Sequence, residues 1–277
     1  MNIAQPSGSA LQRRVPRPFR PLHECSNAEA SILEGLGGVF SELGGGEMLQ
    51  RFGEEIWTAN GPTVSVAGFD YPTRMIVIRL SDGGLFLWSP TAFSSELQRA
   101  VDLLGPVRHI VAPNTLHHTF IADWQQAYPD AKSYAVPQLR AKRPDLKWDS
   151  DLKDTPAAAW SKDIDQVVVR GNRITTEVVF FHRHSRTAIF TDLIQHFEPE
   201  WFKGWRALIA RLDLLTAPKP TVPRKFRVTF YDRTIARQAL QRIMAWPTEA
   251  VLAAHSAPVT QGGRDAIAHA FGWLLGR

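Results

Sequence analysis

The feature of the sequence that most constrains the fold is an alternation of apolar strands and helices between residues 75 and 136. Residues 75–80 and 85–88 are rich in β-branched and large apolar side chains, and Ser81-Asp82-Gly83-Gly84 between them supplies a hairpin turn. Further on, the pattern predicts a helix at 97–104, a strand at 109–112, a loop at 113–118, a helix at 120–127 and a strand at 133–136. Strands separated by helices need crossover connections, so this order predicts an α/β fold with helices packed on a sheet.

The rest of the chain continues this mixture without a repeat at a fixed period. The predicted strands are 56–58, 167–169, 177–181, 187–190 and 249–254, and the predicted helices are 201–212, 235–243 and 266–274. Residues 139–163 are charged and irregular, and we expect Trp148 and Trp160 to anchor them as an exposed insertion. Nucleic-acid contact is the alternative interpretation of basic residues beside aromatic ones.

The composition of the chain limits the classes of protein to which it can belong. Hydrophobic residues make up 44% and charged residues 21% of the chain, as is typical of a globular domain, and no apolar run is long enough to span a bilayer. We therefore expect a soluble, cytoplasmic protein. A net charge of +5 does not by itself indicate a nucleic-acid partner. The expected partner is a small-molecule substrate or ligand that the residues do not identify, and a partner protein is the alternative for a binding module. The sequence gives no indication of the oligomeric state.

Residues 1–46 differ in composition from the rest, and we predict that they form a tail outside a folded domain of residues 47–277. The first part, to Leu22, contains several prolines and four arginines but no acidic residue. A leader for organelle import is the alternative, because such leaders are also rich in arginine and poor in acids. Pro16 and Pro18 oppose the amphipathic helix that a leader needs, which favours a plain tail.

Metal-capable side chains follow three of the predicted strands. His117 and His118 lie in the loop after the strand at 109–112, Asp192 follows Phe190, and His255 ends the last strand. Loops beyond the carboxyl ends of strands converge at one edge of a layered α/β fold, and imidazole with carboxylate suits zinc, iron or manganese. Each residue also has a structural alternative, because such histidines satisfy buried carbonyls and aspartates cap helices.

Other reactive side chains fit a site less well. The single cysteine, Cys25, lies in the predicted tail, and it excludes an internal disulfide and a thiolate-rich zinc site. His182 and His184 have the H-x-H spacing, but they fall in a predicted hairpin turn at the opposite edge of the sheet. We therefore expect both imidazoles to be exposed to solvent.

The segment from His109 to His118, with the helix and the strand that follow it, resembles the metallo-β-lactamase superfamily. The order of parts from about Met48 to the carboxyl terminus is similar to a bacterial branch described as a domain of unknown function. This resemblance implies a four-layer αβ/βα sandwich of two mixed sheets flanked by helices. It also implies a metal site at the strand ends.

The metal-binding loop departs from the superfamily's H-x-H-x-D-H pattern. Pro113 and Thr115 stand at the first two histidine positions, His117 stands at the aspartate position, and His118 stands at the last histidine position. Two ligands of the superfamily's first metal are therefore absent from this loop.

The remaining ligand positions are partly kept. Residues 170–173 lack the histidine of the superfamily's Gly-rich turn, whereas Asp192 resembles the bridging aspartate and His255 the final histidine. The resemblance thus implies that His117, His118, Asp192 and His255 bind one divalent ion, with Asp192 and His118 as the catalytic candidates.

Two functions follow from this set of residues. The first is a metal-dependent hydrolase with an atypical, mononuclear site, in which the ion activates a water. The alternative is a non-catalytic binding module that keeps the fold but has lost the metal, because folds outlive particular sites. Nucleic-acid processing is a third and weaker hypothesis, and the substrate cannot be identified from the residues.

Overall fold

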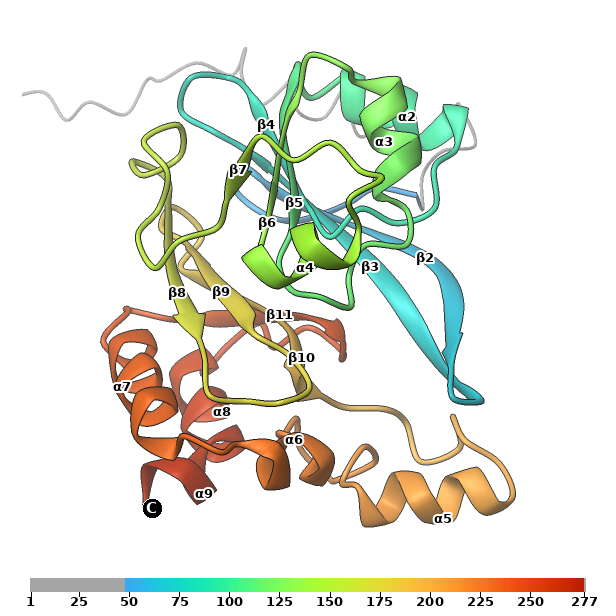
Figure 1. Cartoon of the computed structure of the whole chain (residues 1–277), viewed down its shortest axis with the longest axis vertical. Coiled ribbons are helices and arrows are strands. Elements are labelled where there is room, and N and C mark those ends of the chain that lie inside the picture. The colour runs from blue at the N-terminus through green and yellow to red at the C-terminus, as the bar shows by residue number, and fades with distance from the viewer. Residues whose placement is uncertain (1–47, 277) are drawn as a thin grey trace, which may run out of the picture. The chain divides into compact units, whose positions relative to one another are not determined.

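A computed structural model describes residues 48–276 of the chain. The predicted tail, residues 1–46, and Cys25 within it lie outside this range. Within it, the chain folds into two mixed sheets with helices on their outer faces (Figure 1).

The first sheet contains seven strands that are neighbours in chain order. They are β1 (Gln50–Gly53), β2 (Ile56–Val66), β3 (Phe69–Arg79), β4 (Leu85–Trp88), β5 (Val107–Ala112), β6 (Lys132–Ala135) and β7 (Ser150–Asp151). Strands β1 to β4 pair antiparallel, whereas β4 to β7 pair parallel. The parallel half confirms the crossover connections predicted from the alternation of strands and helices.

The second sheet contains four strands in the order β11-β10-β9-β8. They are β8 (Ile164–Val169), β9 (Glu177–His182), β10 (Thr187–Gln195) and β11 (Ala250–His255). Strand β10 pairs antiparallel with β9 and parallel with β11, with Phe190 opposite Ala253. The carboxyl ends of β10 and β11 therefore lie side by side, and these ends carry Asp192 and His255.

Helices cover both sheets (Figure 1). They are α2 (Ser95–Asp102), α3 (Ile121–Ala127), α4 (Pro137–Lys142), α5 (Trp205–Leu212), α6 (Arg224–Thr229), α7 (Arg233–Met244), α8 (Gly263–Ala270) and α9 (Gly272–Leu275). Helix α3 packs on β5 of the first sheet, while α7 and α8 pack on β8, β10 and β11 of the second. This arrangement confirms the predicted sandwich of two mixed sheets flanked by helices.

Side chains of the second sheet alternate between two cores. Val178 and Phe180 of β9 pack toward the first sheet, whereas Val179 and Phe181 pack with the apolar residues of α7 and α8. Successive side chains of a strand point to opposite faces, and here both faces are covered. The sequence of β9 is for this reason an unbroken apolar run rather than an alternating one.

Strands β2 and β3 extend well beyond their predicted ranges and form a long hairpin. Prediction gave only 56–58 and 75–80, because Gly61 and the prolines of this segment weaken a strand signal. Gly61 is needed there, since a Cβ at this position would overlap the Thr91 hydroxyl. The extension matters for function because it forms one wall of the cleft described below.

Several local predictions are confirmed and others are wrong. Trp148 and Trp160 are buried and anchor the insertion, as expected. The helix predicted from Trp201 begins only at Trp205, and the short helices α4 and α6 were not predicted. No helix within residues 48–276 is long and apolar enough to cross a bilayer.

His182 corrects the expectation that both histidines of the H-x-H segment are exposed. Strand β9 stays paired through His182, which lies opposite Thr187 on one side and Ile164 on the other. Its side chain is buried, and its Nδ1 lies 2.8 Å from the hydroxyl of Ser185. His184, two residues further along the turn, is exposed as expected.

Candidate metal centre

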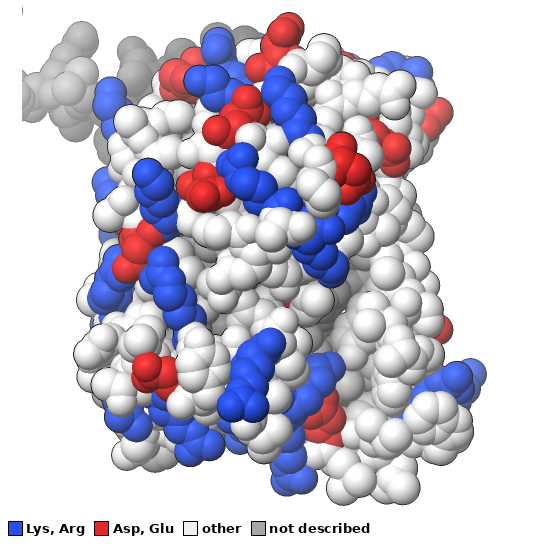
Figure 2. Space-filling view, in the orientation of Figure 1, with Lys and Arg blue, Asp and Glu red and all other residues white. Residues whose placement is uncertain are grey.

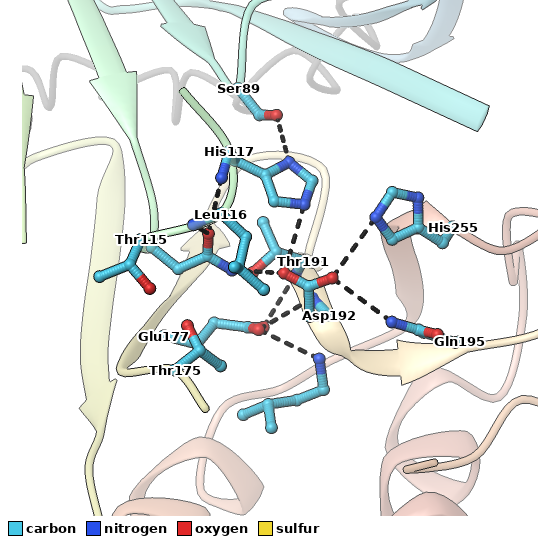
Figure 3. Close-up of polar contacts among 12 residues, drawn as sticks. Ser89, Thr115, Leu116, His117, Thr175, Glu177, Thr191, Asp192, Gln195 and His255 are labelled. Atoms are coloured by element: carbon cyan, nitrogen blue, oxygen red, sulfur yellow. Dashed lines mark hydrogen bonds and ion pairs between the residues drawn. The ribbon is translucent and has the colours of Figure 1, made fainter. Parts of the chain in front are cut away.

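Three side chains from different elements converge at one edge of the sandwich (Figure 3). His117 comes from the loop after β5, Asp192 from β10 and His255 from the end of β11. Each offers one ligand atom, and these atoms all lie within 4.8 Å of one another. Nε2 of His117 lies 3.3 Å from one carboxylate oxygen of Asp192, and Nε2 of His255 lies 3.4 Å from the other.

His255 is held by the long β3 strand of the first sheet. Its Nδ1 lies 2.8 Å from the carbonyl oxygen of Pro72, and because a carbonyl only accepts, Nδ1 carries the proton. Arg74 of the same strand donates to the carbonyl oxygens of Ala253 and Ser256 on either side of His255. These contacts fix the imidazole with its Nε2 toward Asp192.

The loop that carries His117 is shaped by Asn114. The side-chain oxygen of Asn114 accepts hydrogen bonds from the backbone N–H groups of Leu116 and His117, which forms a tight Asx turn. On the other side of the imidazole, Nδ1 of His117 lies 2.7 Å from the hydroxyl of Ser89. The turn and the hydroxyl together direct Nε2 of His117 at Asp192 (Figure 3).

Asp192 is the centre of the group. The Asn114 amide donates to Oδ2 at 2.6 Å, and the amide of Gln195 lies 3.4 Å from Oδ1. Burial would raise the pKa of Asp192, but the charges and hydrogen bonds of His117 and His255 outweigh it and hold the pKa well below its ordinary value. For His255, burial is the larger effect and lowers its pKa. Because Nδ1 of His255 already donates to Pro72, the contact with Asp192 needs either a second proton, on Nε2, or a cation between the two groups.

Glu177 supports the strand segment that carries Asp192. Its fully buried carboxylate accepts hydrogen bonds from the backbone N–H groups of Thr191, Asp192 and Leu193, at 2.8, 2.9 and 3.0 Å. Burial, together with the nearby Asp192 charge, raises the pKa of Glu177 to about 7. The three contacts explain the break in pairing between β10 and β11 after Phe190, because Glu177 takes up the N–H groups there.

His118 does not join the three-residue group. Its Nδ1 lies 2.9 Å from a guanidinium nitrogen of Arg143, and Arg143 is also paired with Asp145. Burial, and then the positive charges of Lys142 and Arg143, lower the pKa of His118 to about 4. The structure thus brings His117, Asp192 and His255 together and places the fourth expected ligand at the rim beside them.

The positions that lack histidine have structural contacts instead. The carbonyl oxygen of Pro113 accepts a hydrogen bond from Val178 of the second sheet at 2.9 Å. Asn172, in the turn where a histidine is missing, donates to the carbonyl oxygen of Phe226 and so ties that turn to α6. These residues fix the loops around the site without offering a metal ligand.

Sequence reasoning missed several supporting residues. Ser89, Asn114, Gln195 and Glu177 were not among the predicted site residues. Two of them leave a signal in the sequence: a carboxylate at the start of an apolar strand, Glu177, and an asparagine directly after a strand, Asn114. Ser89 leaves none, because its contact with His117 joins elements far apart in the chain, and Gln195, three residues after Asp192 in the same strand, follows no pattern that marks a site residue.

A cleft of about 590 Å³ opens above the group. Its floor includes His117, Asp192 and His255, and one wall is the β2–β3 hairpin. Ile209 of α5 and Leu215 after it also line the cleft. The side-chain oxygen of Gln195 is buried at the floor and has no hydrogen-bond partner among residues 48–276.

The donor set fits one divalent ion. Two imidazoles and a carboxylate are three suitable ligands, which leaves further coordination positions open to water. Each imidazole also has a partner at its other nitrogen, as metal-binding histidines almost always do. A cation between Nε2 of His255 and Asp192 would relieve the repulsion between two acceptors that face each other.

The fold defined by these sheets is the metallo-β-lactamase fold. The structure is similar to a metallo-β-lactamase from Hirschia baltica, with a TM-score of 0.55 and 11% identity over 82% of this chain and 96% of that one. It is also similar to one from Pontibacter korlensis, with a TM-score of 0.56 and 13% identity over 83% and 99% of the two chains. The metallo-β-lactamase FIM-1 from Pseudomonas aeruginosa, in its mono-zinc form, gives a TM-score of 0.57 and 10% identity over 82% and 94%. At these identities the likeness concerns the fold.

Within this fold the chain belongs to the family described as a domain of unknown function, DUF4336, which matches residues 53–203. Residues 53–203 contain His117 and Asp192 but end before His255. No curated protein matches the chain.

Proposed function

We propose that the chain is a metal-dependent hydrolase with a mononuclear centre formed by His117, Asp192 and His255. The ligand atoms are Nε2 of each imidazole and the carboxylate of Asp192. Zinc is the first ion to test, because a similar structure is a metallo-β-lactamase in its mono-zinc form. Manganese and iron are the other ions that suit these ligands.

The contact between His255 and Asp192 is the observation that carries this proposal. Because Pro72 accepts the Nδ1 proton, a neutral His255 has only a lone pair at Nε2, and that lone pair lies 3.4 Å from a carboxylate oxygen. Two buried acceptors facing each other are destabilising unless a proton or a cation lies between them. Since burial lowers the pKa of His255, a cation is the better explanation.

A divalent ion in this place would lower the pKa of a bound water toward neutrality. The residues of the chain would then orient that water and the substrate. The amides of Asn114 and Gln195, which contact the two oxygens of Asp192, would hold that carboxylate in place beside the water. The apolar walls of the cleft exclude bulk water, which strengthens these polar contacts.

Metal loading tests the proposal directly. The purified chain is loaded with zinc, manganese or iron, desalted and measured for bound metal by mass spectrometry, and then assayed on esters, lactones, thioesters and phosphodiesters. We expect one equivalent of metal, and hydrolysis that is lost with a chelator and restored by the ion. The absence of stoichiometric metal, or equal metal in the His255→Ala variant, would refute the metal centre.

A non-catalytic binding module is the second candidate. It is favoured by Pro113 and Thr115, which stand where the superfamily's loop has histidines. This candidate predicts ligand binding in the same cleft with no turnover on any of the four substrate classes. Chelator-sensitive activity would exclude it.

A further inference from the structure

The walls of the cleft above the candidate metal centre are mainly apolar. The hairpin contributes Val64 and Val66 of β2 and Phe69 of β3 to the lining, and Ile209 of α5 and Leu215 contribute further apolar side chains. Polar groups are concentrated on the floor, at His117, Asp192 and His255. A ligand that reaches the floor therefore passes along apolar side chains.

The charges that line the cleft cancel. The lining contains two lysines, Lys142 and Lys225, and two aspartates, Asp192 and Asp213. Lys225 is already engaged, because its ammonium lies 3.5 Å from Asp213 and donates to the hydroxyl of Tyr71 at 2.9 Å. These side chains carry no excess of positive charge, and the charge of the proposed ion would lie at the floor only, so the walls favour a ligand that is not a polyanion.

The apolar wall continues outside the cleft. On α5, Trp205, Leu208 and Leu212 are 58%, 58% and 56% exposed, next to Ile209 at the cleft. Trp205 also contacts Phe69 at the end of the hairpin, with ring centroids 5.9 Å apart. Figure 2 shows that the surface over the hairpin is mostly uncharged. Apolar side chains therefore lie near the cleft as well as in it, and the lining of the cleft, not the exposed face of α5, is where an apolar group would bind.

We infer that the cleft binds the alkyl chain of a neutral acyl ester or lactone, with the ester carbonyl at the floor and the alkyl chain along the apolar side chains that the hairpin and the α5 segment contribute to the lining. The cleavage of that ester rests on the proposed hydrolase function, whereas binding of its alkyl chain in the cleft does not. In the hydrolysis, the oxygen of water bonds to the acyl carbon and the bond from that carbon to the alcohol oxygen breaks. One proton of the water leaves with the alcohol, and the products are a carboxylic acid and an alcohol.

The size of the cleft agrees with such a ligand. A volume of about 590 Å³ lies within the usual range for small-molecule sites, and it holds an alkyl chain beside a compact head group. Each methylene moved from water into an apolar wall should improve binding by about fourfold. Affinity should therefore rise steadily with chain length until the cleft is full.

Uncleavable ketones provide the test. 2-Hexanone, 2-octanone and 2-decanone resemble methyl esters in shape and cannot be hydrolysed, and binding is measured by calorimetry with chelator present. We expect the dissociation constant to fall by about 16-fold for each pair of added carbons. The same dissociation constant for all three ketones would overturn the inference.

Two residues of one helix give a matched pair of variants. Ile209→Asp places a charge in the cleft wall, whereas Leu208→Asp places it on the neighbouring exposed position of α5, which does not line the cleft. We expect Ile209→Asp to weaken 2-decanone binding by at least about tenfold, and Leu208→Asp to leave it within about twofold. Equal weakening by both would overturn the inference.

A second pair guards against a folding defect at Ile209. Val66→Asp changes an exposed residue of the cleft wall on the hairpin, and Val228→Asp changes an exposed residue outside the cleft on α6. The first should weaken ketone binding and the second should not. Because chelator is present, binding that depends on chain length without any metal uptake would refute only the hydrolase. If the protein takes up metal but binds all three ketones with the same affinity, only the proposed binding site for the alkyl chain is refuted.

Discussion

Nε2 of His255 lies 3.4 Å from Oδ1 of Asp192, although the other ring nitrogen, Nδ1, donates a hydrogen bond to the carbonyl oxygen of Pro72. Nε2 of His255 thus faces the carboxylate of Asp192. The ring of His118 faces the guanidinium group of Arg143 instead. The two histidines should therefore differ sharply in their effect on metal binding.

This difference can be measured with single variants. We expect His255→Ala to weaken zinc binding by more than about 100-fold, because loss of a ligand costs more than loss of a contact behind a ligand. His118→Ala should keep one equivalent of zinc with nearly unchanged affinity. Competition with a chromophoric chelator gives both affinities, and a loss in His118→Ala equal to that in His255→Ala would return His118 to the ligand set.

Ser89 should act through His117 rather than on the metal itself. Its hydroxyl lies 2.7 Å from Nδ1 of His117 and holds the ring in place, so Ser89→Ala should lower zinc affinity by about 10-fold to 100-fold. Ser81→Ala is the control, because Ser81 makes a comparable hydroxyl contact, with Asp163, outside the site. Equal zinc affinity in Ser89→Ala and the wild type would contradict the role assigned to Ser89.

Glu177 should matter for stability. A glutamine at this position has one acceptor oxygen and one NH₂ group, so at least one of the three backbone N–H groups would lose its partner. We expect Glu177→Gln to lower the free energy of unfolding by about 1–3 kcal/mol for each N–H group left unpaired.

Urea denaturation measures this loss in the metal-free protein. Glu54→Gln is the matched control, because the side chain of Glu54 is 65% exposed and its change should cost less than about 0.5 kcal/mol. Equal stability of the two variants would show that the carboxylate of Glu177 is dispensable.

Most of the fold could be predicted because hydrophobic periodicity reports local burial. Strands β4, β5, β9 and β10 are short apolar runs bounded by turn residues, and their apolar faces determine where they lie. The extension of the β2–β3 hairpin could not be predicted in this way. Its residues gain their contacts from Thr91 and from the α5 segment, which are distant in the chain.

The candidate site was predicted in part for the same reason. His117, Asp192 and His255 follow strands whose ends meet, so topology alone brings them together. His118 follows the same strand as His117, but the Asx turn at Asn114 sets the direction of each side chain. The direction in which a side chain points from a turn depends on such hydrogen bonds. The spacing of residues along the sequence does not determine these hydrogen bonds.

His182 gives the chain a pH-dependent stability. Burial, with a smaller effect of His184, lowers the pKa of His182 from 6.5 to about 4 in the folded protein. The unfolded chain takes up a proton near pH 6.5, so between pH 6.5 and 4 the unfolded state binds more protons than the folded state. The stability is fully present above pH 6.5 and falls as the pH drops, by about 3 kcal/mol in total for this residue.

Replacing this histidine should flatten the pH profile of stability. His182→Asn keeps a hydrogen-bond donor for the Ser185 hydroxyl oxygen, whose own proton goes to Thr187, but cannot take up a proton, so its free energy of unfolding should fall less steeply between pH 6.5 and 4.5. The expected difference in slope is about 1.4 kcal/mol per pH unit, measured by urea denaturation at a series of pH values. His184→Asn, at the exposed part of the same turn, is the matched control. Identical slopes for His182→Asn and the wild type would mean that His182 is protonated to the same extent in the folded and unfolded states.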